Sequence, residues 1–197
     1  MIDPHAYFDR ELDAHAAAFE AVRRTLAEPF ARMLDVWGAA IENGNKIVFF
    51  GNGGSAGDAQ HIATELTVRY IRDRAPIAAL ALTTDSSTLT AAGNDLGFDH
   101  LFARQIAALG KPGDVAVGIS TSGESPNVLE GLREAQRVGM IATALGGRDG
   151  GSMKAIADPI LIVPARASAR IQEMHIMLGQ MLCGALELRL GLVEEER

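Results

Sequence analysis

The stretch KIVFFGNGGSAGDAQHIATE, residues 46–65, joins a short apolar run to a glycine-rich turn and then to a segment of helical composition. A run that is apolar throughout is typical of a strand buried on both faces, as strands of parallel sheets are. Glycines directly after such a strand allow backbone N–H groups to approach a ligand closely. The stretch therefore predicts a strand, a binding turn and a helix, which is the unit from which α/β sheets are built.

Four more apolar runs follow along the chain and alternate with helical patterns. The runs are IAALAL (77–82), DVAVGIS (114–120), MIATAL (140–145) and PILIVP (159–164). The helical patterns cover residues 55–69, 86–109 with an interruption at 93–95, 126–138 and 152–156. This alternation predicts a parallel sheet with helices on both faces, whose ligands bind at the carboxyl ends of the strands.

The residues before the first strand are helical in pattern and rich in Ala, Leu, Glu and Arg. We expect Pro29 to separate two helices there and Gly44 to end the second one. An arm of this kind is often used to pack against a partner chain. The 197 residues are interpreted as one domain, with a helical arm over 1–43, an α/β core over 46–164 and a long C-terminal helix over 168–192.

Composition excludes several classes of protein. The net charge of −7 argues against a large nucleic-acid surface, although backbone amides can still bind phosphate. The single cysteine, Cys183, excludes an intrachain disulfide, and the charged start MIDPHAYFDREL is not typical of a signal peptide. No apolar run approaches the ~18–20 residues of a membrane span. We therefore expect a soluble, cytoplasmic protein with no nucleic-acid or membrane partner.

The glycine turn matches neither common nucleotide motif well. A P-loop requires Gly-Lys-Ser/Thr, whereas Asp58 follows Gly57. A GxGxxA pattern is present but weak, because the next apolar run ends in threonines rather than in an acidic residue that could hold a ribose. Beyond the turn, His61 and Glu65 are four residues apart and share one helix face, where they could bind a metal or a substrate. Ordinary surface ion pairs show the same spacing, so the spacing alone does not decide.

The third apolar run leads into ISTSGESPNV, where four hydroxyls lie within six residues. Ser125 before Pro126 is a favoured N-cap and first-turn pair, so we expect a helix to begin there. Hydroxyls and free N–H groups at a helix N-terminus favour an anion, and phosphate is the obvious one. An ordinary polar turn with a capping serine is the alternative.

Taken together, these segments resemble the sugar isomerase (SIS) family of phosphosugar-binding domains. The resemblance rests on GNGGSAGDAQHIATEL, LTTDSSTLTAAGNDLGFDHLFARQI, GDVAVGISTSGESPNV and RIQEMHIMLGQMLCGALE, which occur in the family's order and span nearly the whole chain. It implies a three-layer sandwich with a five-stranded parallel sheet (flavodoxin-like SIS fold) preceded by N-terminal helices. It also implies a homotetramer with sites between subunits.

Within the family, the segments are most similar to isomerases that convert sedoheptulose 7-phosphate to D-glycero-D-manno-heptose 7-phosphate, the first step of heptose precursor synthesis for lipopolysaccharide. The resemblance implies a role for each matching residue. The sugar would contact Asn52, Gly53, Gly54, Asn94, Asp95, Glu65 and Gln172, the phosphate would contact Ser120, Thr121, Ser122 and Ser125, and one divalent metal per subunit, expected to be zinc, would bind His61, Glu65 and Gln172.

One position departs from the family pattern. Where the family carries a second histidine, as metal ligand and acid/base partner, this chain has Gln180. An amide cannot titrate, so Gln180 could orient a water or a sugar hydroxyl but could not carry a proton. An amide oxygen is also a poorer zinc ligand than imidazole, which predicts weakened metal binding. His175 is not a simple substitute, and we interpret it as a structural helix histidine.

The expected chemistry is an aldose–ketose interconversion through an enediol. Glu65 is the expected base, and a divalent metal would stabilise the developing oxyanion as a Lewis acid. One carboxylate oxygen cannot both bind a metal tightly and act as a strong base, so the two oxygens of Glu65 would divide these roles or the side chain would move. The alternative is a non-catalytic SIS protein that binds phosphosugars or associates with a replication initiator. Loss of the second histidine favours that alternative, and retention of His61 with Glu65 favours the enzyme.

Overall fold

Five parallel strands form one sheet in the computed structural model, which describes residues 2–194. Their order is β2-β1-β3-β4-β5, so the direction in which the sheet grows reverses between β1 and β3. The strands are β1 (Ile47–Gly51), β2 (Ala79–Ala81), β3 (Val115–Ser120), β4 (Ile141–Gly147) and β5 (Ile160–Val163). Each expected apolar run contains one strand, which confirms the predicted fold class.

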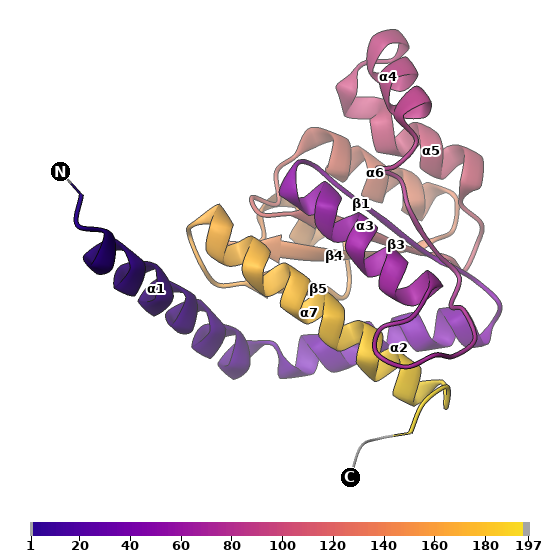
Figure 1. Ribbon diagram of the computed structural model, residues 1–197. Coiled ribbons are helices and arrows are strands. Elements are labelled where there is room, and N and C mark those ends of the chain that lie inside the picture. Colours follow the sequence, from indigo (N-terminus) through magenta and orange to yellow (C-terminus); the bar gives the residue numbers. More distant parts are fainter. Residues whose placement is uncertain (1, 195–197) are drawn as a thin grey trace.

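Helices cover both faces of the sheet and complete the three layers (Figure 1). One face is covered by α1 (Pro4–Thr25), α2 (Ala27–Glu42), α3 (Gly54–Thr67) and α7 (Ser168–Arg189). The other is covered by α5 (Leu101–Leu109) and α6 (Pro126–Arg137). The remaining elements are α4 (Ser86–Asp95) and the short helices η1 (Phe98–His100) and η2 (Gly151–Ala155).

Strand β1 shows why the sheet is buried on both faces. Ile47 and Phe49 belong to the hydrophobic cluster under α2, α3 and α7, whereas Val48 and Phe50 belong to the cluster under α5 and α6. All four side chains are at most 2% exposed, as expected when successive side chains of a strand point to opposite faces. On the first face the Trp37 ring of α2 packs edge-on against Phe49, with the ring centroids 5.3 Å apart.

Three boundaries differ from the sequence expectations. The break between the first two helices falls at Leu26 and not at Pro29, because proline is tolerated in a first turn whose N–H groups lack intrahelical partners. The expected helix over 86–109 is interrupted at Gly97, where a positive φ of 89° separates α4 from η1 and α5. The C-terminal helix ends at Arg189 rather than at 192.

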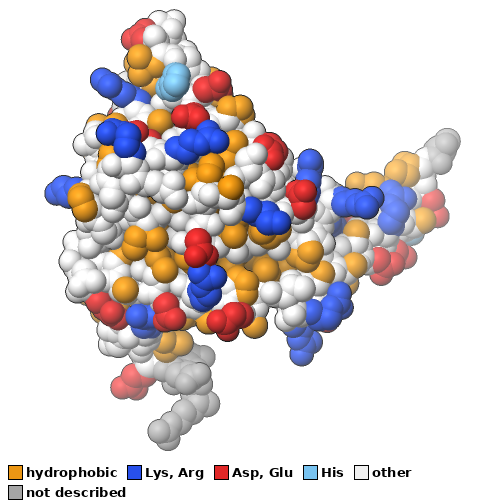
Figure 2. All heavy atoms as spheres, turned by 180° about the vertical axis from the view of Figure 1, so that it is seen from behind, with side chains coloured by type: hydrophobic (Ala, Val, Ile, Leu, Met, Phe, Trp, Pro, Cys, Tyr) orange, Lys and Arg blue, Asp and Glu red, His pale blue; other side chains and the backbone are white. Residues whose placement is uncertain are grey.

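Helix α1 extends away from the body of the molecule (Figure 1), and hydrophobic side chains lie along it in the view of Figure 2. Polar contacts connect it to α7, since Glu11 forms an ion pair with Arg170 and His15 Nδ1 lies within hydrogen-bonding distance of Glu173 Oε2, at 2.8 Å. No helix among residues 2–194 is both long and apolar enough to cross a bilayer. The expected single domain of 1–197 includes residues 1 and 195–197, which lie outside the described residues.

Candidate functional site

Two loops meet where the strand order reverses, which is the place where open α/β sheets bind ligands. The glycine loop (residues 51–54) follows β1, and the serine loop (residues 120–125) follows the neighbouring strand β3. A reciprocal pair of hydrogen bonds joins them. The amide of Asn52 donates to and accepts from the amide of Asn127, both at 2.8 Å, and Asn127 is 1% exposed in the first turn of α6. This bond pair fixes one loop relative to the other.

The glycine loop approaches helix α7 so closely that a side chain would not fit. A Cβ atom built on Gly54 would lie 2.5 Å from Nε2 of Gln172, so the amide of Gln172 rests against the start of α3. A second close contact lies further along both helices, where a Cβ on Gly179 of α7 would lie 2.4 Å from Cδ1 of Ile62 of α3. Helices α3 and α7 therefore run side by side in the same direction, as Figure 1 also shows.

One face of α3 carries the candidate catalytic pair. His61 Nε2 lies 2.9 Å from Glu65 Oε1, within hydrogen-bonding distance, and Glu65 is the less exposed partner, with 18% of its side chain accessible against 47% for His61. The predicted helical spacing thus brings these two residues into contact. Gly179 lies against Ile62, so the following residue, Gln180, stands at the level of this pair on α7, where it is half-buried.

Asp58 lies three residues before His61 on the same helix face, and we did not single it out as a site residue from the sequence. Its Oδ2 is buried and has no hydrogen-bond partner among the described residues. Burial raises the pKa of Asp58 to about 6, while the nearby His61 acts in the opposite direction. The i, i+3, i+7 spacing of Asp58, His61 and Glu65 was a signal that could have revealed it.

A buried ion pair anchors the end of α3 that carries Glu65. The guanidinium of Arg74 donates to Glu187 Oε1 at 2.8 Å, and both side chains are at most 3% exposed. The same guanidinium donates to the backbone carbonyls of Glu65 and Leu66, each at 2.8 Å. It therefore satisfies carbonyls that the last turn of a helix leaves free, and it fixes the backbone of Glu65.

The hydroxyls of the serine loop gather at the start of α6. Ser120 Oγ lies 3.1 Å from Ser125 Oγ and 3.4 Å from Ser122 Oγ. Ser125 is the N-cap residue of α6 with Pro126 at the first position, as predicted, but its side chain makes no capping bond. Thr121 Oγ1 lies 3.5 Å from Ser168 Oγ at the start of α7. The arrangement offers an anion several hydroxyls and a helix N-terminus.

Asn94 and Asp95 occupy a different position. They form the exposed C-terminal end of α4, where Asn94 Nδ2 donates to Asp95 Oδ1 at 2.7 Å. A hollow of about 260 Å³ beside the glycine loop is lined by Thr83, Thr90 and Phe98 among others, and not by these two residues. Their contact with a sugar stays a prediction.

His175 lies inside the molecule, on the face of α7 that packs against the sheet. It is fully buried, and its Nε2 donates to the carbonyl oxygen of Gly146 at the end of β4, at 2.8 Å. Burial lowers the pKa of His175 to about 4, with the bond to Gly146 acting in the opposite direction. The imidazole is therefore neutral at physiological pH and ties α7 to the sheet.

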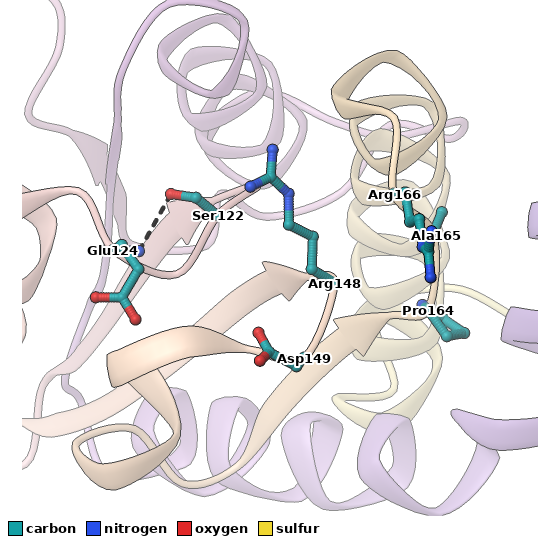
Figure 3. A pocket seen from close by; sticks show the side chains of 7 residues that line it. All are labelled: Ser122, Glu124, Arg148, Asp149, Pro164, Ala165 and Arg166. Atoms are coloured by element: carbon teal, nitrogen blue, oxygen red, sulfur yellow. Dashed lines mark hydrogen bonds between the residues drawn. The ribbon is translucent and has the colours of Figure 1, made fainter.

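A cavity of about 890 Å³ opens beside the serine loop at the ends of β4 and β5. Its lining includes Ser122, Arg148 and Arg166, and Figure 3 shows Arg148 extending from the end of β4 toward Ser122. Neither arginine was expected from the sequence to belong to a site. The segment GGRDGG (146–151), which places glycine pairs on either side of Arg148 directly after a strand, was the available signal.

The described residues contain no group of three or more His, Cys, Asp or Glu side chains that could hold a metal ion. Imidazole and carboxylate are donors that zinc accepts, and His61 with Glu65 supplies one of each. Gln172 stands at the level of Gly54, about 10 Å along the helix axis from His61 and about 16 Å from Glu65. Within one chain, the donors fit an open, weakly held cation site and not a closed four-ligand site.

In chemical terms, the chain supplies a carboxylate that can accept a proton, in the last turns of α3, and a hydroxyl-rich anion site after β3, near the opposite end of that helix. Both Gln172, near the glycine loop, and Gln180, near the level of Ile62, carry amides that can hydrogen-bond hydroxyl groups. This arrangement suits proton transfer on a phosphorylated polyhydroxy compound.

Comparison with known proteins gives consistent matches. A family model described as "SIS domain" matches residues 12–147. The phosphoheptose isomerase of Paramagnetospirillum magneticum is 52% identical over 181 residues, covering 92% of this chain and 94% of the relative. The solved phosphoheptose isomerase of Neisseria gonorrhoeae is 42% identical with a TM-score of 0.89, covering 94% and 100%. The one from Francisella tularensis is 33% identical with a TM-score of 0.91, covering 95% and 100%.

Proposed function

The chain belongs to the SIS-domain family of phosphoheptose isomerases, and from this membership we propose that it interconverts sedoheptulose 7-phosphate and D-glycero-D-manno-heptose 7-phosphate. The reaction is an aldose–ketose isomerisation and the first step toward heptose precursors. Curated relatives that carry this name match over nearly the whole chain, and they select the enzyme over the non-catalytic SIS protein that was the alternative.

One observation carries the proposal to a mechanism: Glu65 is held by His61 in the last turns of α3, the helix that follows the glycine loop. Because Glu65 stands about 16 Å along this helix from the glycine loop, the serine hydroxyls that hold the phosphate of the same substrate would come from a neighbouring subunit. With Nε2–H of His61 donating to Oε1, Oε2 of Glu65 is free to accept the proton from the carbon next to the carbonyl. The same oxygen returns the proton to the neighbouring carbon of the enediol, while the hydroxyl proton passes to the former carbonyl oxygen by way of a water molecule. Ser120, Thr121, Ser122 and Ser125 hold the phosphate end.

The amides of the site orient the sugar. Gln180 faces the level of Glu65 and cannot change its charge, so it positions a hydroxyl or a water and does not carry a proton. Gln172, Asn52 and the backbone N–H groups of Gly53 and Gly54 contact the hydroxyls of the chain nearer the glycine loop. Asn94 and Asp95 are assigned to the sugar as well.

We also propose a weakly bound divalent cation, zinc, with His61, Glu65 and Gln172 as its protein ligands, where Gln172 would come from a neighbouring subunit because it stands too far along the helix from His61 and Glu65 of its own chain. When bound, it supplies Lewis-acid stabilisation of the developing oxyanion. The amide at position 180 weakens this site, so Gln180→His should raise zinc affinity, measured by competition with a chromophoric chelator. Unchanged affinity in that variant would remove position 180 from the metal site. His61→Asn is the matched variant, in which affinity should fall.

The enzyme is proposed to act in the cytoplasm as a homotetramer with its sites between subunits. Exposed Tyr7, Phe8, Leu12 and Phe19 on α1 support this assembly, as does an apolar groove of about 410 Å³ between α1, α2 and α7. Light scattering on the wild type and on Phe19→Glu measures it. A tetramer that dissociates in the variant supports the assembly, and a monomeric wild type contradicts it.

Turnover of sedoheptulose 7-phosphate by Glu65→Gln tests the proposed base. The variant keeps the shape of the side chain but loses the proton acceptor, so kcat should fall by about 10²–10⁴-fold. Glu130→Gln, which removes an exposed carboxylate paired with Arg133 on α6, is the control and should leave the rate as it is. Equal rates for wild type and Glu65→Gln would rule out Glu65 as the base.

A further inference from the structure

The cavity beside the serine loop has the size of a small-molecule site. Its volume of about 890 Å³ lies within the range of roughly 300–1,000 Å³ that is usual for ligand pockets. One wall is formed by the serine loop, with Ser122 and Glu124, and the opposite wall by the segment Pro164–Arg166 that leads into α7 (Figure 3). Arg148 lies between the two walls in this view.

Four charged side chains line the cavity, but only the cations are free to bind a ligand. Glu124 accepts hydrogen bonds from the backbone N–H and the hydroxyl of Ser152, both at 2.7 Å. Asp149 accepts from the N–H of Gly151 at 3.2 Å. Among residues 2–194, neither Arg148 nor Arg166 has a hydrogen bond or an ion pair. The cavity therefore presents two unpaired guanidinium groups.

The backbone holds Arg148 in a conformation that is unfavourable for any residue with a side chain. Its φ of 59° is the one positive value at a non-glycine position in the described chain. The neighbouring glycines allow the loop after β4 to lie in close contact with the serine loop. A Cβ on Gly147 would lie 2.7 Å from the carbonyl oxygen of Thr121, and one on Gly151 would lie 2.8 Å from that of Ser122. Glycine would suit position 148 better, so the arginine is retained at a cost in stability.

The serine loop itself offers only neutral donors to a phosphate dianion. Ser120, Thr121, Ser122 and Ser125 contribute hydroxyls and N–H groups but no positive charge. Guanidinium binds phosphate through two parallel charged hydrogen bonds, which are stronger than neutral ones. Arg148, with its strained backbone, lines the same cavity as Ser122 and extends toward it in Figure 3, so it brings a positive charge to this wall.

We propose that Arg148 is a phosphate-binding residue of the isomerase, closing over the phosphate monoester held by the serine loop, with Arg166 as a second cation on the far wall. The proposal rests on the proposed function, since it assigns the phosphate end of that same substrate. Under this proposal the loop after β4 is part of the substrate site, and phosphate binding accounts for an arginine at a position whose backbone conformation favours glycine.

Steady-state kinetics and phosphate binding of Arg148→Gln, Arg148→Gly and the control Arg104→Gln test it. Arg104 is an exposed arginine on α5 that lines neither the cavity beside the serine loop nor the hollow beside the glycine loop. For Arg148→Gln, the KM for sedoheptulose 7-phosphate and the Kd for inorganic phosphate, measured by calorimetry, should each rise about 10- to 100-fold, because a charged hydrogen bond is lost. Most of the loss should appear in KM rather than kcat, and Arg104→Gln should match the wild type.

The Arg148→Gly variant separates binding from folding. Glycine relieves the positive φ, so its Tm should equal or exceed that of the wild type while its phosphate affinity falls as in Arg148→Gln. If both variants keep the wild-type KM and phosphate Kd within twofold, the assignment is wrong. If the wild type binds phosphate but turns over no sedoheptulose 7-phosphate, the proposed isomerase fails, and the phosphate Kd values still decide the role of Arg148.

Discussion

At the scale of single residues, the amide pair of Asn52 and Asn127 joins the loop assigned to the sugar to the helix whose start is assigned to the phosphate. Both amides keep further hydrogen-bonding capacity, since each uses one donor and one acceptor in the pair. Asn127 is almost fully buried and does not itself reach the proposed ligand. It is therefore a positioning residue, which sets the orientation of the Asn52 amide.

Replacement of Asn127 by Asp tests this role. Aspartate has the same shape but presents an acceptor to the Oδ1 of Asn52, so the reciprocal pair is broken in a buried place. We expect a loss of about 1–3 kcal/mol in the free energy of unfolding and at least about a tenfold loss in kcat/KM. Chemical denaturation and steady-state kinetics measure the two effects. A variant that is destabilised but keeps its kcat/KM would show that Asn127 is merely structural.

Single residues were predictable where their partners are close in sequence. The bond between His61 and Glu65 follows from a spacing of four on a helix, and the hydroxyl cluster follows from one short loop. Asn127, Arg74 and Arg148 were missed because they act on groups from other segments; Asn52 and Asn127 are 75 positions apart, and Arg74 and Glu187 are 113 apart. Only the fold brings such pairs together.

At the scale of elements, helices α3 and α7 lie close together because glycines stand at their contact points. Gly54 makes room for Gln172, and Gly179 makes room for Ile62. The positions of Glu65 and Gln180 relative to one another depend on this contact. A change in the spacing of the two helices therefore alters the geometry of the site without touching a catalytic group.

A pair of alanine substitutions on α3 separates helix propensity from helix packing. Alanine favours a helix over glycine by up to about 1 kcal/mol. At Gly57, where a Cβ would meet nothing within 4 Å, stability should rise and activity should not change. At Gly54 the methyl group must displace the flexible amide of Gln172, so folding is kept while KM rises severalfold. Thermal unfolding and kinetics of both variants measure this, and equal KM values would contradict the role of Gln172.

The elements themselves were largely predictable from the sequence. Buried strands are uniformly apolar and short, so each of the five runs was recognisable, and Gly44 with its positive φ of 76° follows the end of α2 as expected. The misplaced break at Pro29 has a physical reason, since a proline inside the first turn does not interrupt a helix. The strand order came from the family resemblance, because apolar runs carry no information about which strands are neighbours.

At the scale of the whole molecule, one buried histidine couples stability to pH. His175 bonds to Gly146 and stays neutral in the folded state, because burial lowers its pKa to about 4, whereas the unfolded chain has the ordinary value near 6.5. Between these values the unfolded state binds more protons than the folded state does. Stability that is complete above pH 6.5 is therefore lost as the pH falls toward 4.

The variant His175→Gln should make this dependence weaker. It will be less stable than the wild type at pH 7, because packing around the imidazole is lost. Its free energy of unfolding should nevertheless fall less steeply between pH 6.5 and 4, by up to about 3 kcal/mol at ~1.4 kcal/mol for each pH unit. Urea denaturation at several pH values measures both slopes. Parallel curves for the two proteins would show that His175 does not titrate on unfolding.

The indole of Trp37 is an intrinsic fluorescence probe of this chain. It is the only tryptophan, it is fully buried, and it rests on Phe49 of β1, under α2 and not at either ligand loop. The tryptophan fluorescence, excited at the red edge of protein absorbance, therefore reports whether α2 is packed against the sheet. The emission maximum should move to longer wavelength on denaturation and stay nearly constant when a sugar phosphate binds. Ligand titrations therefore need another signal, and the constant tryptophan fluorescence can serve as its internal reference.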